Sequence, residues 1–468
     1  MNNTKPHIIL INSPLFKEFN ALYDEDSLPP LGLGYIGTQL RENGYKVSLI
    51  DAVAQRLPLS ELISVLDSKK PTFIGLNIFT TNYELVKELV LSISFDTKFI
   101  IGGLSTKELY KEIIQWNTKN PIDVVTGDGE LITLDLISDK LIENPIEIHN
   151  NKRVFKVDSH SKYYVKDIDN LNLDRTFFIN EPVIHPLGFK EANIVTSRGC
   201  IFNCSFCAAA YSMNKDFGTR ERNIESVQKE LQQIVNEFPE VTSIRVLDDL
   251  FLKRAKHVLY ATKVFNPFQL KWRSMAHVQT FRNVSIEDLI GMKSSGCEEL
   301  FIGVESGSPT ILKSINKTNN PELIIQNLSK VLKAGISIKA YFIYGFPNET
   351  LDDMELTYNL ALRLSEIASE CGVHFRTSVF QYRPYHGTAL YHEILDRGFD
   401  ASEVKSIIPN EDLSNMVKRI QFNFHSCNFS KVGLDVLHSY ICKTTELNST
   451  KLFESLRHTN KSRNLKAM

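Results

Sequence analysis

The stretch Arg198-Gly199-Cys200-Ile201-Phe202-Asn203-Cys204-Ser205-Phe206-Cys207 places three cysteines within a single short segment. Thiolates are the soft ligands that hold iron–sulfur clusters, and closely spaced cysteines are the usual sequence sign of such a site. A ferredoxin-type cluster takes four cysteines, so Cys200, Cys204 and Cys207 would leave one iron without a protein ligand. By analogy with zinc sites that keep three protein ligands, an open position predicts chemistry rather than a structural role.

A structural zinc site is the first alternative for these cysteines. Structural zinc normally has four ligands, often arranged as two Cys-x2-Cys pairs. The chain has 7 cysteines, and those outside the stretch stand alone in the sequence, which leaves no second pair. The spacing therefore favours a cluster with an open iron over zinc or a chance grouping. The isolated cysteines are Cys297, Cys371, Cys427 and Cys442.

The composition is that of a globular protein with several domains. A chain of 468 residues is long enough for about three domains. Hydrophobic residues make up 43% and charged residues 23%, as in ordinary soluble proteins. The formal net charge of −2 offers no electrostatic footprint for DNA or RNA, so a nucleic-acid substrate is disfavoured. No apolar run approaches membrane-spanning length, and the odd cysteine count favours a reducing compartment, so we expect a cytoplasmic protein without a membrane span.

Residues 1–141 alternate short apolar runs with amphipathic segments, the pattern of a doubly wound parallel sheet. The predicted strands cover residues 7–12, 46–50, 73–77, 98–101 and 123–125. Glycines and small polar residues follow the later strands, in 77–80, 102–103 and 127–130. Open α/β sheets bind ligands beyond the carboxyl ends of their strands, and glycine permits close approach of the backbone to a flat ligand. The alternative, which composition leaves open, is that these glycines only form tight turns.

The rest of the chain divides into three segments. Residues 142–192 lack regular periodicity and are predicted to form a small hairpin and a linker. Residues 193–397 return to alternation, with predicted strands at 194–196, 243–247, 271–274, 299–304, 337–344 and 376–382. These make about six β–α units, and barrels of such units hold their chemistry at the carboxyl ends of the strands. Four charged residues could serve either the site or a salt bridge, and a salt bridge is favoured for the two arginines; the four are Asp248, Asp249, Arg220 and Arg222. Residues 398–468 are predicted to be a helical extension, with helices at 410–420, 434–447 and 452–457.

The spacing Cys200-x3-Cys204-x2-Cys207 resembles the signature of the radical S-adenosylmethionine (radical SAM) enzymes. The resemblance implies that these thiolates hold a 4Fe–4S cluster, that the open iron binds S-adenosylmethionine, and that residues 193–397 form a partial (β/α)6 barrel. It also implies that Phe206 lies beside the adenine and Glu305 at the ribose, where a carboxylate accepts hydrogen bonds from vicinal hydroxyls. The residues expected around S-adenosylmethionine are Phe206, Glu305, Ser306, Gly307 and Gly345.

Ahead of these cysteines, residues 1–141 resemble the Rossmann-like cobalamin-binding domain of one radical SAM subfamily. The resemblance rests on Pro29 to Leu33, on Gly44 with Asp51, on Gly102-Gly103 and on Gly127-x-Gly129-Glu130. The cobalamin mutases and methionine synthase carry an Asp-x-His-x-x-Gly motif whose histidine ligates cobalt, and this chain has no such motif. The resemblance therefore implies a cobalamin held without a protein histidine on its lower face. The residues expected around cobalamin are Pro30, Gly32, Asn77, Thr80, Gly102, Gly103, Gly127 and Glu130.

Together these resemblances imply a cobalamin-dependent radical SAM methyltransferase. A 5′-deoxyadenosyl radical would take hydrogen from an unactivated carbon of a small-molecule or peptide substrate, and cobalamin would supply the methyl group. An external electron donor such as flavodoxin or ferredoxin would reduce the cluster. The cofactors carry the hard chemistry, so no catalytic residue is assigned beyond the three cysteines.

The sequence leaves three alternatives open. A cobalamin-dependent radical SAM cyclase or rearrangement enzyme would keep both cofactors without methyl transfer. A radical SAM enzyme in which the first domain only binds a substrate or a partner would need no cobalamin, and a non-catalytic iron–sulfur electron-transfer protein would hold the same cluster. Transfer-RNA methylthiotransferases share the cysteine spacing, but they carry further cluster cysteines in the first domain, and this chain has none before Cys200.

Overall fold

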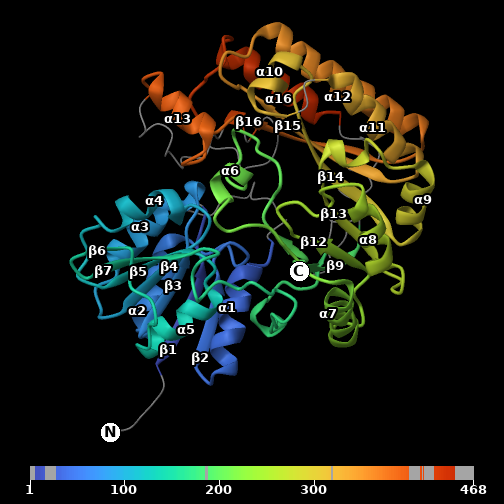
Figure 1. Cartoon of the computed structure of the whole chain (residues 1–468). Coiled ribbons are helices and arrows are strands. Elements are labelled where there is room, and N and C mark those ends of the chain that lie inside the picture. Colours follow the sequence, from blue (N-terminus) through green and yellow to red (C-terminus); the bar gives the residue numbers. More distant parts are fainter. Residues whose placement is uncertain are drawn as a thin grey trace, which may run out of the picture.

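The computed structural model describes residues 6–15, 28–184, 188–317, 320–399, 412–413, 415 and 426–447. Within them lie two seven-stranded sheets, each flanked by helices, and a two-stranded ribbon (Figure 1). No helix in these ranges is both long and apolar enough to cross a membrane. The helices predicted at 410–420 and 452–457 fall outside the described residues apart from 412, 413 and 415, whereas the one predicted at 434–447 is present as α16 (Leu434–Thr445).

The first sheet is doubly wound, as predicted from the sequence. Its strands are β1 (His7–Asn12), β2 (Lys46–Asp51), β3 (Phe73–Asn77), β4 (Lys98–Gly102), β5 (Ile122–Gly127), β6 (Glu147–His149) and β7 (Lys152–Val157). They run in the order β2-β1-β3-β4-β5-β7-β6, and all neighbours are parallel except β6 and β7. Its helices are α1 (Leu31–Glu42), α2 (Leu59–Lys69), α3 (Tyr83–Ser92), α4 (Thr106–Ile113) and α5 (Glu130–Ser138).

These helices cover both faces of the first sheet. Ile8 and Leu10 of β1 pack with residues of α1 and α5, whereas Ile9 and Ile11 pack with residues of α2, α3 and α4. The alternation follows from the two-residue period of a strand that is buried on both faces. Because the strands are parallel, the loops at 77–80, 102–103 and 127–130 meet at one edge of the sheet, where a ligand can bind.

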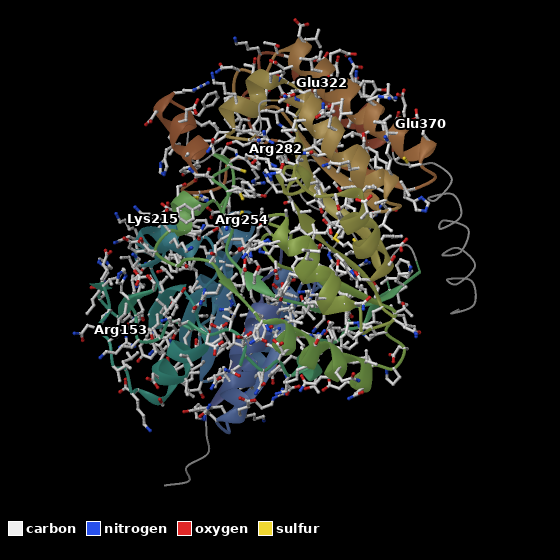
Figure 2. The ribbon with its side chains drawn as sticks, turned by 45° about the vertical axis from the view of Figure 1, so that its right-hand side comes forward. Arg153, Lys215, Arg254, Arg282, Glu322 and Glu370 are labelled. Atoms are coloured by element: carbon white, nitrogen blue, oxygen red, sulfur yellow. The ribbon has the colours of Figure 1, made fainter. Side chains whose placement is uncertain are left out.

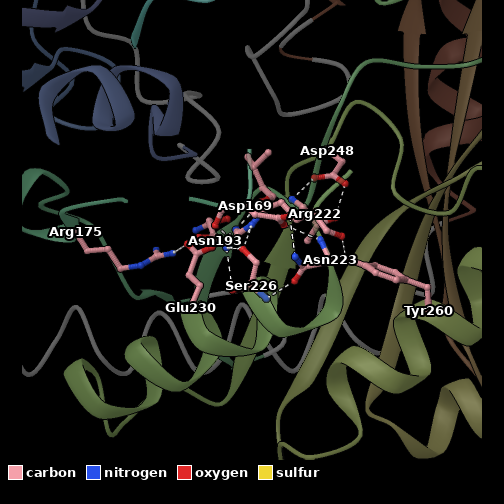
Figure 3. Close-up of polar contacts among 11 residues, drawn as sticks. Asp169, Arg175, Asn193, Arg222, Asn223, Ser226, Glu230, Asp248 and Tyr260 are labelled. Carbon is pink, nitrogen blue, oxygen red and sulfur yellow. Dashed lines mark hydrogen bonds and ion pairs between the residues drawn. The ribbon is translucent and has the colours of Figure 1, made fainter. Parts of the chain in front are cut away.

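The hairpin predicted within residues 142–192 is present, and it extends the first sheet through β7, which lies parallel to β5. The segment then crosses to the second sheet through η2 (Arg175–Phe177) and β8 (Val183–Ile184). Arg175 fixes this crossing, because its guanidinium donates to Glu181 at 2.7 Å and to Glu230 at 2.6 Å. Arg222 donates to the other oxygen of Glu230 and so forms the predicted salt bridge (Figure 3). The domain limits at residues 141, 192 and 397 stay a prediction.

The second sheet carries the six parallel strands of the predicted partial barrel, with β8 antiparallel at its edge. Its parallel strands are β9 (Lys190–Ile194), β12 (Ser243–Val246), β13 (Lys271–Ala276), β14 (Cys297–Glu305), β15 (Ser337–Tyr344) and β16 (Phe375–Gln381). The strand predicted at 194–196 is wrong in position: β9 ends at Ile194, because the Thr196 N–H bonds to the Asp248 carboxylate at 2.7 Å instead of continuing the sheet. The helices on one face of this half-barrel are α7 (Ile224–Glu237), α8 (Lys256–Phe265), α9 (Ile286–Ser294), α11 (Pro321–Lys333), α12 (Leu351–Glu370) and α16 (Figure 1).

The other face of this sheet is the inner face of the half-barrel, and it holds a buried set of ion pairs. Glu299 of β14 accepts two hydrogen bonds from Arg376 of β16, at 2.7 and 2.6 Å, and one from Arg273 of β13 at 3.1 Å. Arg273 donates twice to Glu191 of β9, at 2.7 and 2.6 Å. We call these four residues the inner ion network, and they connect strands from both edges of the half-barrel.

Candidate active site

The cysteines lie on a loop that leaves and rejoins the half-barrel through a ribbon of β10 (Ser197–Arg198) and β11 (Arg220–Glu221). Gly199 and Gly218 close the neck of this cysteine loop, and both have positive φ, 85° and 64°. A Cβ atom on Gly199 would stand 2.9 Å from the Gly218 carbonyl oxygen. Backbone packing therefore requires glycine directly before the first cysteine.

Two carboxylates after β12 hold the start of the cysteine loop. Asp248 accepts from the N–H and the hydroxyl of Thr196 at 2.7 and 2.6 Å, and from the Ser197 hydroxyl at 2.7 Å. Burial raises the pKa of Asp248 even with these hydrogen bonds. Asp249 accepts the Gly199 N–H at 3.0 Å. The two side chains fix where the loop begins.

Cys200, Cys204 and Cys207 are half-buried on this loop, and none forms a disulfide. Burial raises the pKa of all three thiols, that of Cys207 to about 12, so a nearby positive centre is needed to keep them as thiolates. In the described part of the chain, no three His, Cys, Asp or Glu side chains converge closely enough to share one metal ion. Thiols spread over one loop suit a cluster, in which each thiolate binds a different iron. The donor set therefore fits the predicted 4Fe–4S cluster.

Glu305, the residue expected at the ribose, ends β14 beside a buried lysine. A register shift after Gly303 gives Glu305 a positive φ of 67°. Its Oε1 accepts from the Lys317 ammonium at 2.8 Å. Burial alone would lower the pKa of Lys317, but Glu305 and then Cys204 outweigh burial and raise it. Oε2 of Glu305 has no hydrogen-bond partner among the described residues, so one acceptor remains for a ligand hydroxyl.

Phe206 lies next to the loop that follows β15. Its ring packs edge-on against the ring of Phe346, with the centroids 5.8 Å apart. Ser306 and Gly307 contact α12. The Ser306 hydroxyl and the Gly307 N–H contact the Thr357 hydroxyl at 2.9 and 3.0 Å. Both residues thus hold the loop after β14 on α12, and their contact with S-adenosylmethionine stays a prediction.

Gly345 begins the loop after β15 and is held by a buried carboxyl group. It has a φ of 91°, and its N–H donates to Oε2 of Glu349, as does the Phe346 N–H at 3.2 Å. Oε1 of Glu349 has no hydrogen-bond partner in the described ranges. Burial raises the pKa of Glu349 to about 8, which favours the protonated carboxyl at neutral pH.

Glu349→Gln is expected to remove a pH dependence of stability. A carboxyl whose pKa rises from 4.5 in the unfolded chain to about 8 in the folded one opposes folding as pH rises through this window, because only the folded chain keeps the proton. The uncharged amide still accepts from both N–H groups. The free energy of unfolding is measured by urea titration at about pH 5 and at about pH 8.5. Between these two pH values it should fall by about 1–3 kcal/mol more in the wild type than in the variant. Parallel pH profiles for the two proteins would contradict the buried-carboxyl assignment.

A cavity of about 460 Å³ lies over the carboxyl ends of the first sheet, and it collects seven of the eight residues expected around cobalamin. A Cβ atom on Gly32 would meet no atom within 4 Å, and one on Gly102 would meet only the Val125 carbonyl oxygen at 3.9 Å, so both face open space. None of the described lining residues is a histidine. This glycine-lined surface fits a flat macrocycle. The seven residues are Pro30, Gly32, Asn77, Gly102, Gly103, Gly127 and Glu130.

Thr80, the eighth residue, is not brought to this cavity. Its hydroxyl lies 3.0 Å from Nδ1 of His386, on the loop after β16. Beside it, Gly387 packs against Glu108 of α4, where a Cβ atom on the glycine would stand 2.1 Å from the glutamate side chain. Thr80 therefore belongs to a contact between the first domain and the half-barrel.

Arg198 joins the cavity to the cysteine loop. It lines the cavity and precedes Cys200 by two positions. Its guanidinium donates to Asp128 at 3.0 Å and also to Glu130, while Arg220 donates to both oxygens of Asp128, one at 3.1 Å. Burial alone would lower the pKa of Arg198, but Glu130 and Asp128 outweigh burial and raise it. We call Asp128, Glu130, Arg198 and Arg220 the domain bridge, in which Arg220 forms its predicted salt bridge.

Three residues of the site have no signal in the sequence. Arg198 and Lys317 are ordinary basic residues until folding brings carboxylates from distant segments to them. His277, after β13, stacks on Phe202 of the cysteine loop with centroids 3.7 Å apart and planes 14° apart. Burial, followed by Lys317, lowers the pKa of His277 to about 2, so the ring is neutral at the loop.

Comparison with known proteins agrees with this geometry. Residues 194–361 match the radical SAM superfamily, and residues 22–137 match the B12 binding domain. An uncharacterized methyltransferase of Pyrococcus horikoshii is 26% identical over 346 residues, 72% of this chain and 73% of that protein. An anaerobic magnesium-protoporphyrin IX monomethyl ester cyclase of Cereibacter sphaeroides is 22% identical over 404 residues, 82% of this chain and 63% of that protein. The fold is similar to that of the radical S-adenosylmethionine methyltransferase TsrM from Kitasatospora setae, solved with tryptophan and a SAM analog, with a TM-score of 0.64 and 14% identity over 96% of this chain and 90% of that one.

Each matched segment falls on a different sheet. The B12 binding match covers strands β2 to β5 of the sheet that carries the cavity, and the radical SAM match covers the cysteine loop and the strands from β12 to β15. The chain belongs to the cobalamin-dependent radical SAM enzymes. The cofactors of this family are a 4Fe–4S cluster, S-adenosylmethionine and cobalamin, which are the groups that the cysteine loop, Glu305 and the cavity fit.

Proposed function

We propose that this enzyme methylates an unactivated carbon of a small-molecule or peptide substrate. When bound, the cluster and S-adenosylmethionine supply hydrogen abstraction from carbon, and cobalamin supplies methyl transfer. The chain's own part is to hold these groups in position and to keep water from them. The similarity to the methyltransferase of Pyrococcus horikoshii and to TsrM supports this class of reaction.

The observation that carries the proposal is the wall shared by the cavity and the cysteine loop. Val195 and Arg198 line the cavity, and the chain reaches Cys200 two residues later. The domain bridge fixes this arrangement with partly buried ion pairs between the two domains. A methyl carrier in the cavity and a cluster on the loop would therefore lie on either side of one short ribbon, as sequential action on one substrate requires.

The proposal is tested with the full chain, reconstituted anaerobically with iron, sulfide and cobalamin. The protein is supplied with a reductant, candidate substrates and S-adenosylmethionine labelled in its methyl group. A methyltransferase of this kind should form 5′-deoxyadenosine and transfer the label to the product. A reconstituted protein that binds no cobalamin would overturn the proposal.

Gly102→Leu is expected to lower the cobalamin content at least about tenfold while the fold is kept. Gly102 has no positive φ, and its Cβ position is free of clashes, so the longer side chain would extend into the cavity. The content is read from the visible spectrum after anaerobic incubation with hydroxocobalamin and desalting. Gly291→Leu on α9, where an added Cβ atom also meets nothing within 4 Å, is the matched control. Equal cobalamin content in the two variants would contradict the assignment of the cavity.

We also propose that an electron donor such as flavodoxin or ferredoxin approaches beside Ile201. A cavity of about 260 Å³ adjoins this residue, which directly follows Cys200. Arg254 (Figure 2) and Lys256 are exposed there and suit an acidic carrier, since opposite charge speeds encounter. The lining consists of Ile201, Thr219, Glu221, Lys253, Arg254, Lys256 and His257.

Cyclisation or rearrangement without methyl transfer is the second candidate. It is favoured by the similarity to the cyclase of Cereibacter sphaeroides, which extends over 82% of this chain. The labelled-methyl experiment separates the two candidates, because a cyclase would form 5′-deoxyadenosine but place no label in its product.

A further inference from the structure

Arg245 lies on the inner face of the half-barrel, in the middle of β12. Its neighbours Ile244 and Val246 belong to the core beneath the helices, so the arginine points to the opposite side of the sheet. Its guanidinium carbon lies 4.9 Å from the centre of the Phe301 ring on β14. The side chain is only half-buried, so a ligand inside the half-barrel can reach it.

The inner face carries more positive than negative charge among its described residues. Both carboxylates of the inner ion network are engaged by the arginines of that network. Arg245 and Lys339 are two further cations, and the Lys339 ammonium lies 5.9 Å from the same Phe301 ring. No carboxylate in the described part of the chain pairs with Arg245. A partly desolvated cation without a counter-charge is costly, and an anionic ligand would supply that counter-charge.

Beside this arginine lies a buried side-chain amide that forms no hydrogen bond with the described residues. Asn193 of β9 is paired with Arg245 in the register of the two strands, so both side chains point to the same face. Asn193 is 1% exposed, and neither Oδ1 nor Nδ2 has a partner among the described residues. Its carbonyl is held by Arg175 at 2.9 Å (Figure 3), which keeps the residue in place. An unsatisfied buried amide is costly, so it indicates a site where a ligand completes the hydrogen bonds.

The inner surface of β15 leads from this layer of cations to the cysteine loop. Tyr341 and Ile343 follow Lys339 on the same side of the strand, over a distance of roughly 13 Å. The Tyr341 ring stacks on that of Phe380 at 6.1 Å and 16°. Ile343 and Phe206 of the cysteine loop pack against the same hydrophobic cluster. The inner surface of β15 and β16 is therefore flat and apolar between the cations and the cysteine loop.

We propose that Arg245 and Asn193, with Lys339 nearby, bind an anionic group of the substrate, a carboxylate or a phosphate. The flat apolar body of the substrate then lies along Tyr341 and Phe380, toward the cysteine loop. A guanidinium donates two parallel hydrogen bonds to either anion, and the Asn193 amide donates a further one. The inference deepens the proposed function and rests on it for calling the ligand a substrate.

The test measures binding of two anionic probes, benzoate and phenyl phosphate, to the full chain by calorimetry. Benzyl alcohol is the uncharged control. The wild type should bind at least one of the two anions at least about tenfold more tightly than it binds benzyl alcohol. Binding of benzoate would indicate a carboxylate site, and binding of phenyl phosphate would indicate a phosphate site. Arg245→Gln should lose this preference, and Arg245→Lys should keep part of it. Arg282→Gln, at an exposed arginine on the segment after β13 (Figure 2), is the matched control and should bind as the wild type does.

Asn193→Asp keeps the test informative if Arg245→Gln does not fold. The new carboxylate would pair with Arg245, so this variant should be at least as stable as the wild type and still bind the anion about tenfold less tightly. Anion binding that is absent from the wild type, or unchanged in both variants, would overturn the inference. A loss of S-adenosylmethionine binding in Arg245→Gln would also overturn it, because the arginine would then serve that cofactor. These experiments measure binding alone, so their failure can be distinguished from a failure of methyl transfer in the labelled-methyl experiment.

Discussion

Cys204→Ala is expected to abolish both the iron–sulfur cluster and the reductive cleavage of S-adenosylmethionine. The cysteine loop offers three thiols, and burial raises the pKa of each, so only bound iron keeps them as thiolates. With one thiolate removed, two irons of the cluster would lack a protein ligand. After anaerobic reconstitution the variant should lose the broad visible absorption of the cluster, and 5′-deoxyadenosine formation should fall at least about 1,000-fold.

Cys371→Ala is the matched control for this prediction. Cys371 is also half-buried and also outside any disulfide, but it follows the last residue of α12. Its variant should keep the visible spectrum and the rate of 5′-deoxyadenosine formation. A cluster retained in Cys204→Ala at wild-type iron content would contradict the assignment of the loop.

Glu299→Gln is expected to lower the free energy of unfolding by about 3 kcal/mol or more. Burial alone would raise the pKa of Glu299, but Arg376, then Arg273, outweigh burial and hold it well below its usual range. The amide keeps the shape of the side chain and removes the charge that both guanidinium groups face. Urea denaturation followed by the fluorescence of Trp272, which adjoins Arg273 on β13, measures the loss.

The pH dependence of this effect has a definite sign. A carboxylate whose folded pKa is lowered stabilises fully above its unfolded value of 4.5 and loses that contribution as pH falls below it. The difference between the wild type and Glu299→Gln should therefore be largest near pH 7 and shrink toward about pH 3. Glu366→Gln, which removes an exposed pair with Arg363, should cost less than about 1 kcal/mol. An equal loss in the two variants would contradict a structural role for the inner ion network.

The architecture was predictable because the spacing of apolar residues along the sequence indicates each strand and helix. Alternating strands and helices indicated both sheets, and five of the seven strands in the second sheet were predicted at the right place. The position of the cavity could also be predicted, because glycines that follow parallel strands must meet at one edge of the sheet. Two strands of the second sheet were exceptions: β8 was not predicted, and β9 was predicted at the wrong position, because its end is set by a hydrogen bond from Thr196 to Asp248 rather than by its apolar pattern.

The polar interior could not be predicted in the same way. Glu299 contacts Arg273 and Arg376, and Arg198 contacts Glu130, across long separations in the chain. Such pairs depend on strand register and on the docking of two domains, neither of which composition or spacing encodes. Thr80 shows the same limit, because its position near a strand end was correct but the adjacent surface is the half-barrel instead of the cavity.

The domain bridge has a thermodynamic consequence. The half-buried Arg198 guanidinium contacts two carboxylates of one domain, while its backbone leads directly into the metal-binding loop of the other. A ligand that binds in the cavity of the first domain and stabilises the docked arrangement also favours binding at the cysteine loop of the half-barrel. Thermodynamic linkage requires that binding at the cysteine loop favours binding in the cavity to the same extent. Loading of the corrin and assembly of the iron–sulfur centre should therefore be cooperative, each raising the affinity for the other by the same factor.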